Sequence, residues 1–174
     1  MGDNIFAYLQ QLEMMAFFSG YPLLYAFIFF ISGNNQSKPN TKKKIAFLLP
    51  FSYALVGTLY LGLQLKKLYP DYSIENIKAT IEQPLLVIWG LLSILFWIPA
   101  LGKKSILSLI HSLVFFFFLL RDLFLQLTTS SADKNIVRND MKIYTDSLLL
   151  NMGAFAFIVL LFFLYTFYKK RFSS

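Results

Sequence analysis

Five long stretches of apolar residues, separated by short polar segments, dominate the pattern along this chain. They cover residues 14–31, 45–64, 84–101, 105–127 and 148–168. Each stretch is close to the roughly 20 residues that a helix needs to cross about 30 Å of hydrocarbon. Backbone groups find no water there, so they must be satisfied within a helix. The pattern predicts an all-α polytopic membrane protein, a single domain over residues 1–174 with about five transmembrane helices.

Shorter features lie between and within these stretches. Ser73 is placed to cap a short helix from Ile74 to Glu82, which would lie on the membrane surface or pack on the bundle as a lid. Pro22, Pro50 and Pro99 are expected to bend or tighten the helices that contain them, because proline lacks the backbone donor of a helical turn.

The composition supports a membrane protein. Of the 174 residues, 57% are apolar and only 14% are charged, against about a quarter in soluble domains. This balance argues against a disordered chain, a coiled coil and an ordinary water-soluble enzyme. The absence of cysteine excludes disulfides, thiolate metal sites and a thiol nucleophile. The net charge of +7 comes from basic residues that flank apolar stretches, so no nucleic-acid partner is expected.

The positions of lysine and arginine predict the orientation. Basic residues of the first loop, the third loop and the tail would all face one side if the chain crosses five times, and cytoplasmic loops carry such an excess. These residues are Lys38, Lys42, Lys43, Lys44, Lys103, Lys104, Lys169, Lys170 and Arg171. We therefore expect an integral protein of a cell membrane, plasma or inner, with the N-terminus outside and the C-terminus in the cytoplasm.

A candidate polar layer follows from the depth of charged residues in the predicted spans. With about 1.5 Å of rise per residue, Glu13, Arg121 and Asn151 fall between roughly 24 and 28 Å from the inner end of their helices. Asp122 follows Arg121 directly. One interpretation is a site open to the outside for an ion or a polar headgroup. The other is an interfacial clamp in which Arg121 reaches the headgroups. A specific hypothesis is that Arg121 couples to Glu13.

His111, the only histidine, lies within the fourth predicted span. A lone histidine in a membrane can relay protons. It more often makes a satisfied interhelical hydrogen bond, here with Ser108, with Ser112 or with a hydroxyl on a neighbouring helix. No second histidine, cysteine or carboxylate is predicted at its depth, so no metal site is expected there.

Small residues in the predicted spans are candidate points of close helix packing. Glycine and alanine let two helix backbones approach, within one chain or between subunits. The candidates are Ala16, Gly20, Gly57, Gly62, Gly153 and Ala154.

No catalytic motif is present, so the sequence predicts a protein that is not an enzyme and needs no cofactor. The leading hypothesis is an integral-membrane subunit that associates with itself or with a membrane-protein partner. One alternative is an oligomeric pore or small transporter, including a membrane effector of a bacterial defence system, because one chain with so few polar residues can hardly line a water path alone. Another is a binder of lipid or another apolar ligand held among the phenylalanine-rich helices.

Overall fold

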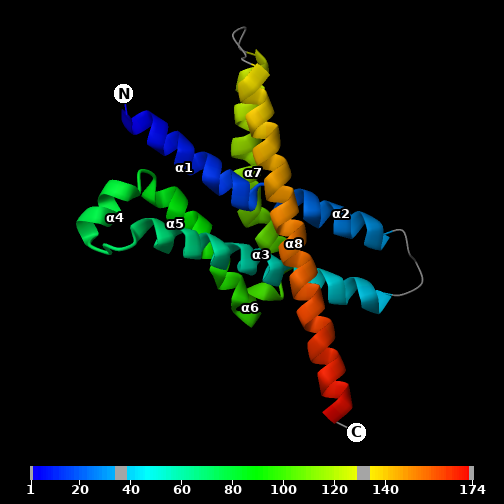
Figure 1. The fold of residues 1–174 in the computed structure, drawn as a ribbon. Coiled ribbons are helices and arrows are strands. Elements are labelled where there is room, and N and C mark those ends of the chain that lie inside the picture. The colour runs from blue at the N-terminus through cyan, green and yellow to red at the C-terminus, as the bar shows by residue number, and fades with distance from the viewer. Residues whose placement is uncertain (1, 34–38, 129–133, 173–174) are drawn as a thin grey trace.

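The computed structural model describes residues 2–33, 39–128 and 134–172, and every element in these ranges is a helix (Figure 1). The predicted all-helical architecture is therefore confirmed for the described part of the chain. The elements are α1 (Gly2–Phe18), α2 (Tyr21–Gly33), α3 (Pro39–Leu68), α4 (Ile74–Thr80), α5 (Pro84–Leu92), the 3-10 helix η1 (Ser93–Trp97), α6 (Pro99–Gly102), α7 (Ser105–Thr128) and α8 (Lys134–Phe172).

Four helical stretches are long and apolar enough to cross a membrane. They are Tyr8–Phe30, Phe47–Leu68, Ser105–Leu125 and Met141–Arg171. A fifth candidate exists only if Ile74–Thr80 and Pro84–Trp97, which meet at 97°, are counted as one broken unit. The predicted number of about five spans thus corresponds to four or five suitable helices. Their insertion and orientation remain predictions.

The first apolar stretch is broken between α1 and α2. Pro22 lacks the amide that would continue the helix, and its ring would clash with the carbonyl of Phe18 four residues earlier. The break leaves the Gly20 amide free to donate to Ser147 Oγ of α8 at 2.9 Å. A Cβ at Gly20 would lie only 2.5 Å from the Leu148 backbone nitrogen, so the close crossing of α8 requires glycine here.

The third apolar stretch, expected as one helix over 84–101, is divided into α5, η1 and α6. Ile98 has an extended backbone with ψ of 123°, because the following Pro99 disfavours the helical conformation for its neighbour. At about 1.5 Å per residue in α5 and 2.0 Å in η1, these two elements extend roughly 23 Å, less than a full hydrocarbon layer. Pro50, by contrast, lies inside the unbroken helix α3.

The short helix between α3 and α5 begins where the sequence predicts it. Ser73 caps α4, its Oγ accepting the amide of Asn76 at 3.2 Å. The helix ends at Thr80, two residues before the predicted end at Glu82. Its Ile74 is 70% exposed and none of its residues is buried, so α4 is not a tightly packed lid.

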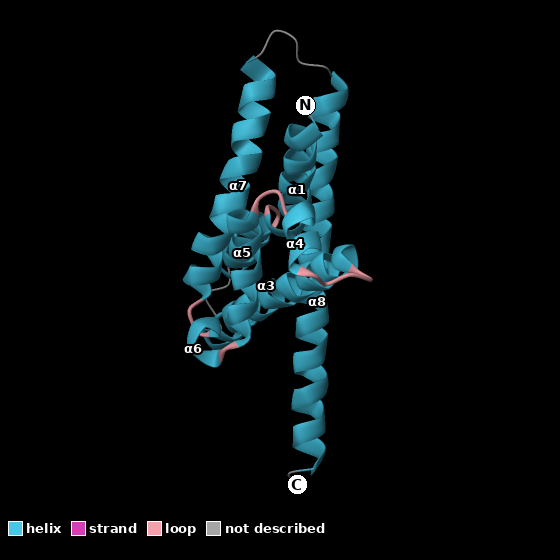
Figure 2. Ribbon diagram, turned by 90° about the vertical axis from the view of Figure 1, so that its left-hand side faces the viewer, coloured by secondary structure: helices cyan, strands magenta, loops and turns pink. Residues whose placement is uncertain are grey.

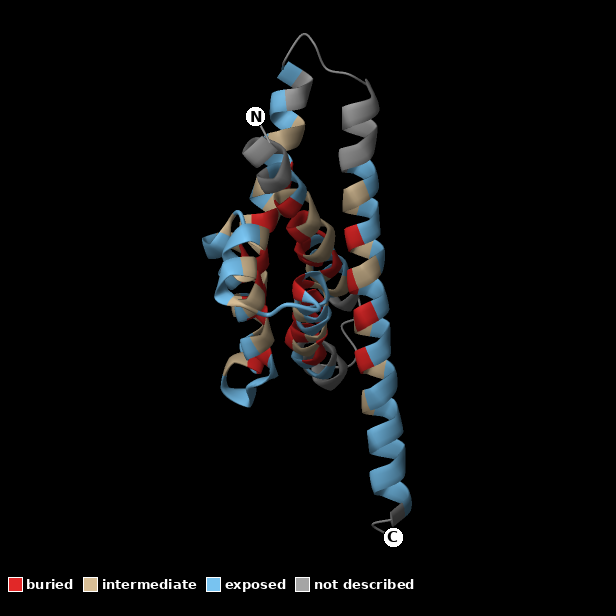
Figure 3. Ribbon diagram, turned by 60° about the vertical axis from the view of Figure 1, so that its left-hand side comes forward, coloured by how far each residue is buried: buried red, intermediate tan, exposed pale blue. Residues whose placement is uncertain are grey.

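Helix α8 is longer than its apolar stretch and reaches beyond the rest of the molecule. It begins at Lys134, fourteen residues before the predicted span at 148–168. It packs on α1 and α3, and its C-terminal end projects past every other helix (Figure 2). Burial along α8 is confined to one face and stops after Ile158 (Figure 3). We call residues 159–171, which are exposed except for the half-buried Val159 and Phe162, the α8 arm.

The buried core lies where α1 and α3 cross α7 and α8 (Figure 1). Aromatic rings fill its centre. The Phe18 ring packs against the rings of Phe115, Tyr60 and Tyr53 at centroid distances of 4.8, 5.3 and 5.7 Å. Edge-to-face and offset contacts of this kind add to the dispersion that all buried side chains of the core provide. The core therefore ties the two crossing helix pairs together and fixes the polar groups around it.

Candidate functional site

Helix α1 makes polar contacts with the helices around it. Glu13 forms an ion pair with Lys67 at the end of α3. Gln11 Nε2 donates to Asp122 Oδ2 of α7 at 2.9 Å, and Gln10 Oε1 accepts the amide of Gln83, which precedes α5, at 2.8 Å. Two members of the predicted polar layer thus take part in contacts of α1, Glu13 with Lys67 and Asp122 with Gln11, but these contacts are separate.

Asn151 is also bound to α1, through its backbone. Its Nδ2 donates to the carbonyl of Phe17 at 2.8 Å and to the carbonyl of Ser147 at 2.8 Å. Asn151 is 1% exposed, and its amide satisfies a carbonyl at the end of α1 that the break before α2 leaves without a helical partner. Asn151 therefore closes the end of α1 rather than serving a carboxylate.

Arg121 is exposed on α7, and the ion pair that the structure gives Glu13 is with Lys67 instead. The four residues of the predicted layer therefore do not form one cluster. Depth along separate helices was a poor guide because α8 starts fourteen residues early and runs beside α7. The ring of Tyr144 on α8 contacts the ring of Phe116 on α7. Because α7 and α8 run in opposite directions, Arg121 and Asn151 lie on opposite sides of this contact along the helices. Sequence distance from an assumed membrane edge cannot reveal such a shift.

His111 connects three helices. Its Nδ1 shares a hydrogen bond with Tyr53 OH of α3 at 2.7 Å, and its Nε2 contacts the carbonyl of Trp89 of α5 at 2.9 Å. Its ring is stacked on the Trp89 indole with centroids 4.8 Å apart. Since the carbonyl can only accept, the assigned tautomer carries its proton on Nε2 and Nδ1 accepts from the tyrosine. The partner of His111 is thus a hydroxyl on a neighbouring helix.

The contact of His111 belongs to a polar seam along α7 that sequence reasoning missed. Tyr21 OH bonds with Ser108 Oγ at 2.7 Å, and Tyr25 OH with Ser105 Oγ at 3.3 Å. The signal was present in the spacing. Ser105, Ser108 and His111 are three residues apart on one side of α7, and Tyr21 and Tyr25 are four apart on α2. Each side chain has a partner from another helix, so the seam joins α2 and α3 to α7.

The candidate packing residues fall into two groups. Gly20 and Gly57 meet neighbours at distances that exclude a larger side chain, since a Cβ at Gly57 would lie 2.0 Å from Ser93 Oγ. Ala154 is buried in the core and Ala16 is half-buried. At Gly62 and Gly153, however, a Cβ would meet nothing within 4 Å. These two glycines lie on free surfaces of α3 and α8.

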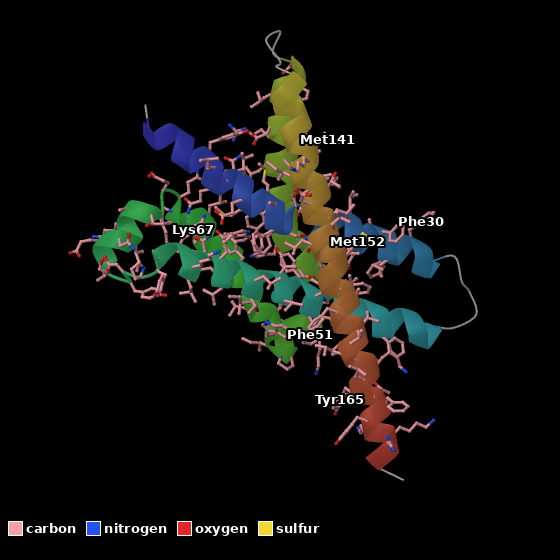
Figure 4. The ribbon with its side chains drawn as sticks, in the orientation of Figure 1. Phe30, Phe51, Lys67, Met141, Met152 and Tyr165 are labelled. Atoms are coloured by element: carbon pink, nitrogen blue, oxygen red, sulfur yellow. The ribbon has the colours of Figure 1, made fainter. Side chains whose placement is uncertain are left out.

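A group of polar atoms without partners surrounds the ion pair between α1 and α3. Tyr60 OH, Gln64 Nε2 and Glu13 Oε1 are buried and make no hydrogen bond among the described residues. Beside them opens a pocket of about 500 Å³. It is lined by Leu9, Gln10, Glu13, Lys67, Ala79, Thr80 and Glu82. Figure 4 shows Lys67 at the C-terminal end of α3, before the chain turns into α4.

A second hollow is almost wholly apolar. Phe30 of α2 and Met152 of α8 lie on its two sides (Figure 4). The groove has a volume of about 620 Å³. It is lined by Leu23, Ala26, Phe27, Phe30, Leu148 and Met152. It offers no hydrogen-bonding side chain, so only a hydrocarbon surface matches it chemically.

Within the ranges that the structure describes, no three histidine, cysteine or carboxylate side chains gather into a group that could hold a metal ion. Comparison with known proteins gave no matching family model, no matching curated protein and no matching solved structure.

Proposed function

We propose that this protein is a non-enzymatic integral-membrane subunit that associates with a second copy of itself or with another membrane protein through α8. The observation that carries the proposal is the α8 arm. Phe163, Phe167 and Tyr168 are 68%, 70% and 64% exposed there, and Leu160, Leu161, Leu164 and Tyr165 are exposed beside them. A helix that is apolar all round is stable only in lipid or against other helices. The arm contains about 13 residues and extends roughly 20 Å.

The polar interior supports a structural role. The side chains of His111 and Ser108 and the Asn151 Nδ2 group bind neighbouring helices, and buried polar groups bonded in this way hold a membrane helix bundle in one arrangement. Small exposed residues on α8, Gly153 above all, would allow the backbone of a partner helix to approach closely.

We further propose five crossings, with the C-terminus in the cytoplasm. The broken third segment runs back along α3, where Gly57 meets Ser93 and Phe51 meets Trp97 and Gly102. This path covers most of the part of α3 that is suited to cross a membrane. Lys103 and Lys104 would then face the same side as Lys44, and the basic residues at the end of α8 would face that side too.

Association through α8 is tested by one substitution with a matched control. Gly153→Leu fills open space on α8, and Gly62→Leu fills equally open space on α3. Both variants should fold and stay in the membrane after a high-pH carbonate wash. We expect the native chain and Gly62→Leu to give particles larger than one chain in mild detergent, measured by light scattering. Gly153→Leu should give monomers. A monomeric native chain, or equal particle sizes for both variants, would contradict the proposal.

A second candidate function, the binding of lipid or another apolar ligand, is favoured by the groove between α2 and α8. The groove is apolar along its whole lining and open at the surface. Ala26→Phe would add a ring on the α2 side of the groove and should displace a bound chain without touching the core. Photolabelling with a lipid whose acyl chain carries a diazirine is expected to mark Phe27 or Met152 in the native chain. Loss of this labelling in Ala26→Phe supports the candidate, and labelling spread evenly over all apolar surfaces contradicts it.

A further inference from the structure

A further pocket opens between α5 and the middle of α7, with α1 at one end. It has a volume of about 500 Å³. It is lined by Gln11, Gln83, Pro84, Leu85, Leu86, Trp89, Val114 and Phe118. None of these side chains is ionisable, so the pocket is an apolar space to which two glutamines contribute.

The two glutamines lie at the same end of this pocket. Gln11 Nε2 donates to Asp122 Oδ2 of α7 at 2.9 Å, and the amide of Gln83 donates to a glutamine side chain of α1 at 2.8 Å. Trp89 follows Gln83 by six residues, about 9 Å along the helix, and its ring is stacked on His111 of α7. The pocket is therefore polar where α1 meets its neighbours and apolar towards Trp89.

The charge around the polar end narrows the class of ligand. Val114, Phe118 and Asp122 follow one another at intervals of four residues, so they share one side of α7. The Asp122 carboxylate thus stands next to the lining and repels an anionic group such as a phosphate. Gln11 uses one N–H for Asp122, and a carboxamide has a second N–H and an oxygen that accepts. Such a group matches an uncharged hydroxyl.

We propose that this pocket binds the hydroxyl end of an uncharged lipid of the diacylglycerol type. The hydroxyl bonds with the Gln11 carboxamide, and the first part of an acyl chain lies against Trp89, Val114 and Phe118. A space of this size takes the glycerol end of the lipid. Leu85 at its edge is 83% exposed, so the chains can continue into the bilayer. The inference rests on the membrane placement proposed above, which puts the polar end at the outer boundary of the hydrocarbon.

Quenching of Trp89 fluorescence reports binding directly. The chain has two tryptophans, so Trp97→Phe leaves Trp89 as the sole indole. This full-length variant is placed in phosphatidylcholine vesicles that contain an equal small fraction of a brominated lipid, which is diacylglycerol, phosphatidylcholine or phosphatidic acid. Bromine near the start of the acyl chain quenches an indole that it contacts. We expect diacylglycerol to associate about threefold to tenfold more strongly than phosphatidylcholine, the range that one or two hydrogen bonds provide. Phosphatidic acid should quench least.

Substitutions in the same background locate the binding site. Gln11→Leu removes the carboxamide, so quenching by diacylglycerol should fall to the level of phosphatidylcholine. Val114→Phe fills the apolar end and should have the same effect while Gln11 stays in place. Asp122→Asn keeps an oxygen that can accept from Gln11 and removes the charge. The preference for diacylglycerol should then remain, and the disadvantage of phosphatidic acid should disappear. Thr145→Val is the control, since Thr145 is exposed on α8 outside the pocket lining, and it should change nothing.

Four results would overturn the proposal. Equal quenching by the three brominated lipids would make the pocket an ordinary lipid contact, while the membrane placement stands. A preference for diacylglycerol that survives both Gln11→Leu and Val114→Phe would put its binding site elsewhere. Stronger quenching by a brominated fatty amine than by diacylglycerol would show that the charge of Asp122 selects the ligand. No quenching of Trp89 by any brominated lipid would contradict the membrane placement itself.

Discussion

At the scale of single residues, the structure replaces an expected cluster of charges with separate contacts between pairs of helices. The candidate residues were recognisable because charged and polar side chains are rare in apolar stretches. Their partners were not, because a partner depends on how helices cross. Glu13 pairs with Lys67, which the sequence places in a loop, and Asn151 binds a backbone carbonyl that is free only because α1 ends at Phe18.

The first prediction concerns His111. His111→Ala leaves Tyr53 OH and the Trp89 carbonyl without partners and opens a cavity beside the stacked indole, so it should cost roughly 2–4 kcal/mol of stability. Tyr53→Phe removes one hydroxyl and should cost about 1 kcal/mol. The check is thermal or denaturant unfolding of both variants in the same detergent. A Tyr53→Phe loss as large as that of His111→Ala would show that the histidine does not join the three helices.

The second prediction compares glycines. Gly20→Ala places a methyl group against the backbone of Leu148 and should destabilise the protein by about 1–3 kcal/mol. Gly62→Ala adds a methyl group in open space within a helix and should be neutral or stabilise by up to about 1 kcal/mol. The measurement is the unfolding midpoint of each variant relative to the native chain in one unfolding assay. Equal effects at both positions would rule out the close crossing of α8 over the break.

At the scale of elements, apolar stretches were a good guide to where helices lie and a poor guide to their ends. The stretch 105–127 coincides almost completely with α7, Ser105–Thr128. The stretch 148–168 covers barely half of α8, because a helix continues through polar residues as long as its backbone bonds and one packed face are kept. The divisions at Gly20 and Ile98 arise from proline, and the sequence indicated their positions but not whether the helix would bend or break.

The third prediction concerns the broken segment of α5, η1 and α6. If it crosses the membrane, the two loops that flank it face opposite sides. The chain has no native cysteine, so Lys66→Cys and Lys103→Cys each give one reactive thiol. In sealed vesicles of one orientation, a membrane-impermeant maleimide should label one variant from outside and the other only after the vesicles are opened. Labelling of both variants from the same side would make the segment a re-entrant hairpin. The chain would then cross the membrane four times, with both termini on the same side.

At the scale of the whole molecule, the buried core and the exposed α8 arm are separate parts of the structure. The crossing of α1 and α3 with α7 and α8 encloses a core of aromatic rings, and the hydrogen bond between His111 and Tyr53 lies within it. The α8 arm lies outside this core and exposes large apolar side chains from Leu160 to Tyr168, before the basic residues at its end. The core is already packed within the chain, whereas the arm has no packing partner among the described residues, which is why we propose that lipid or another chain covers it.

The central claim is that the α8 arm lies in the hydrocarbon of a membrane. The most direct measurement is cysteine accessibility in membrane sheets open on both faces. We predict that Phe163→Cys resists a water-soluble maleimide until the sheets are dissolved in sodium dodecyl sulfate. Lys142→Cys, on the charged first part of the same helix, should react at once. If Phe163→Cys in intact sheets reacts as fast as Lys142→Cys, the arm is in water and the account is wrong.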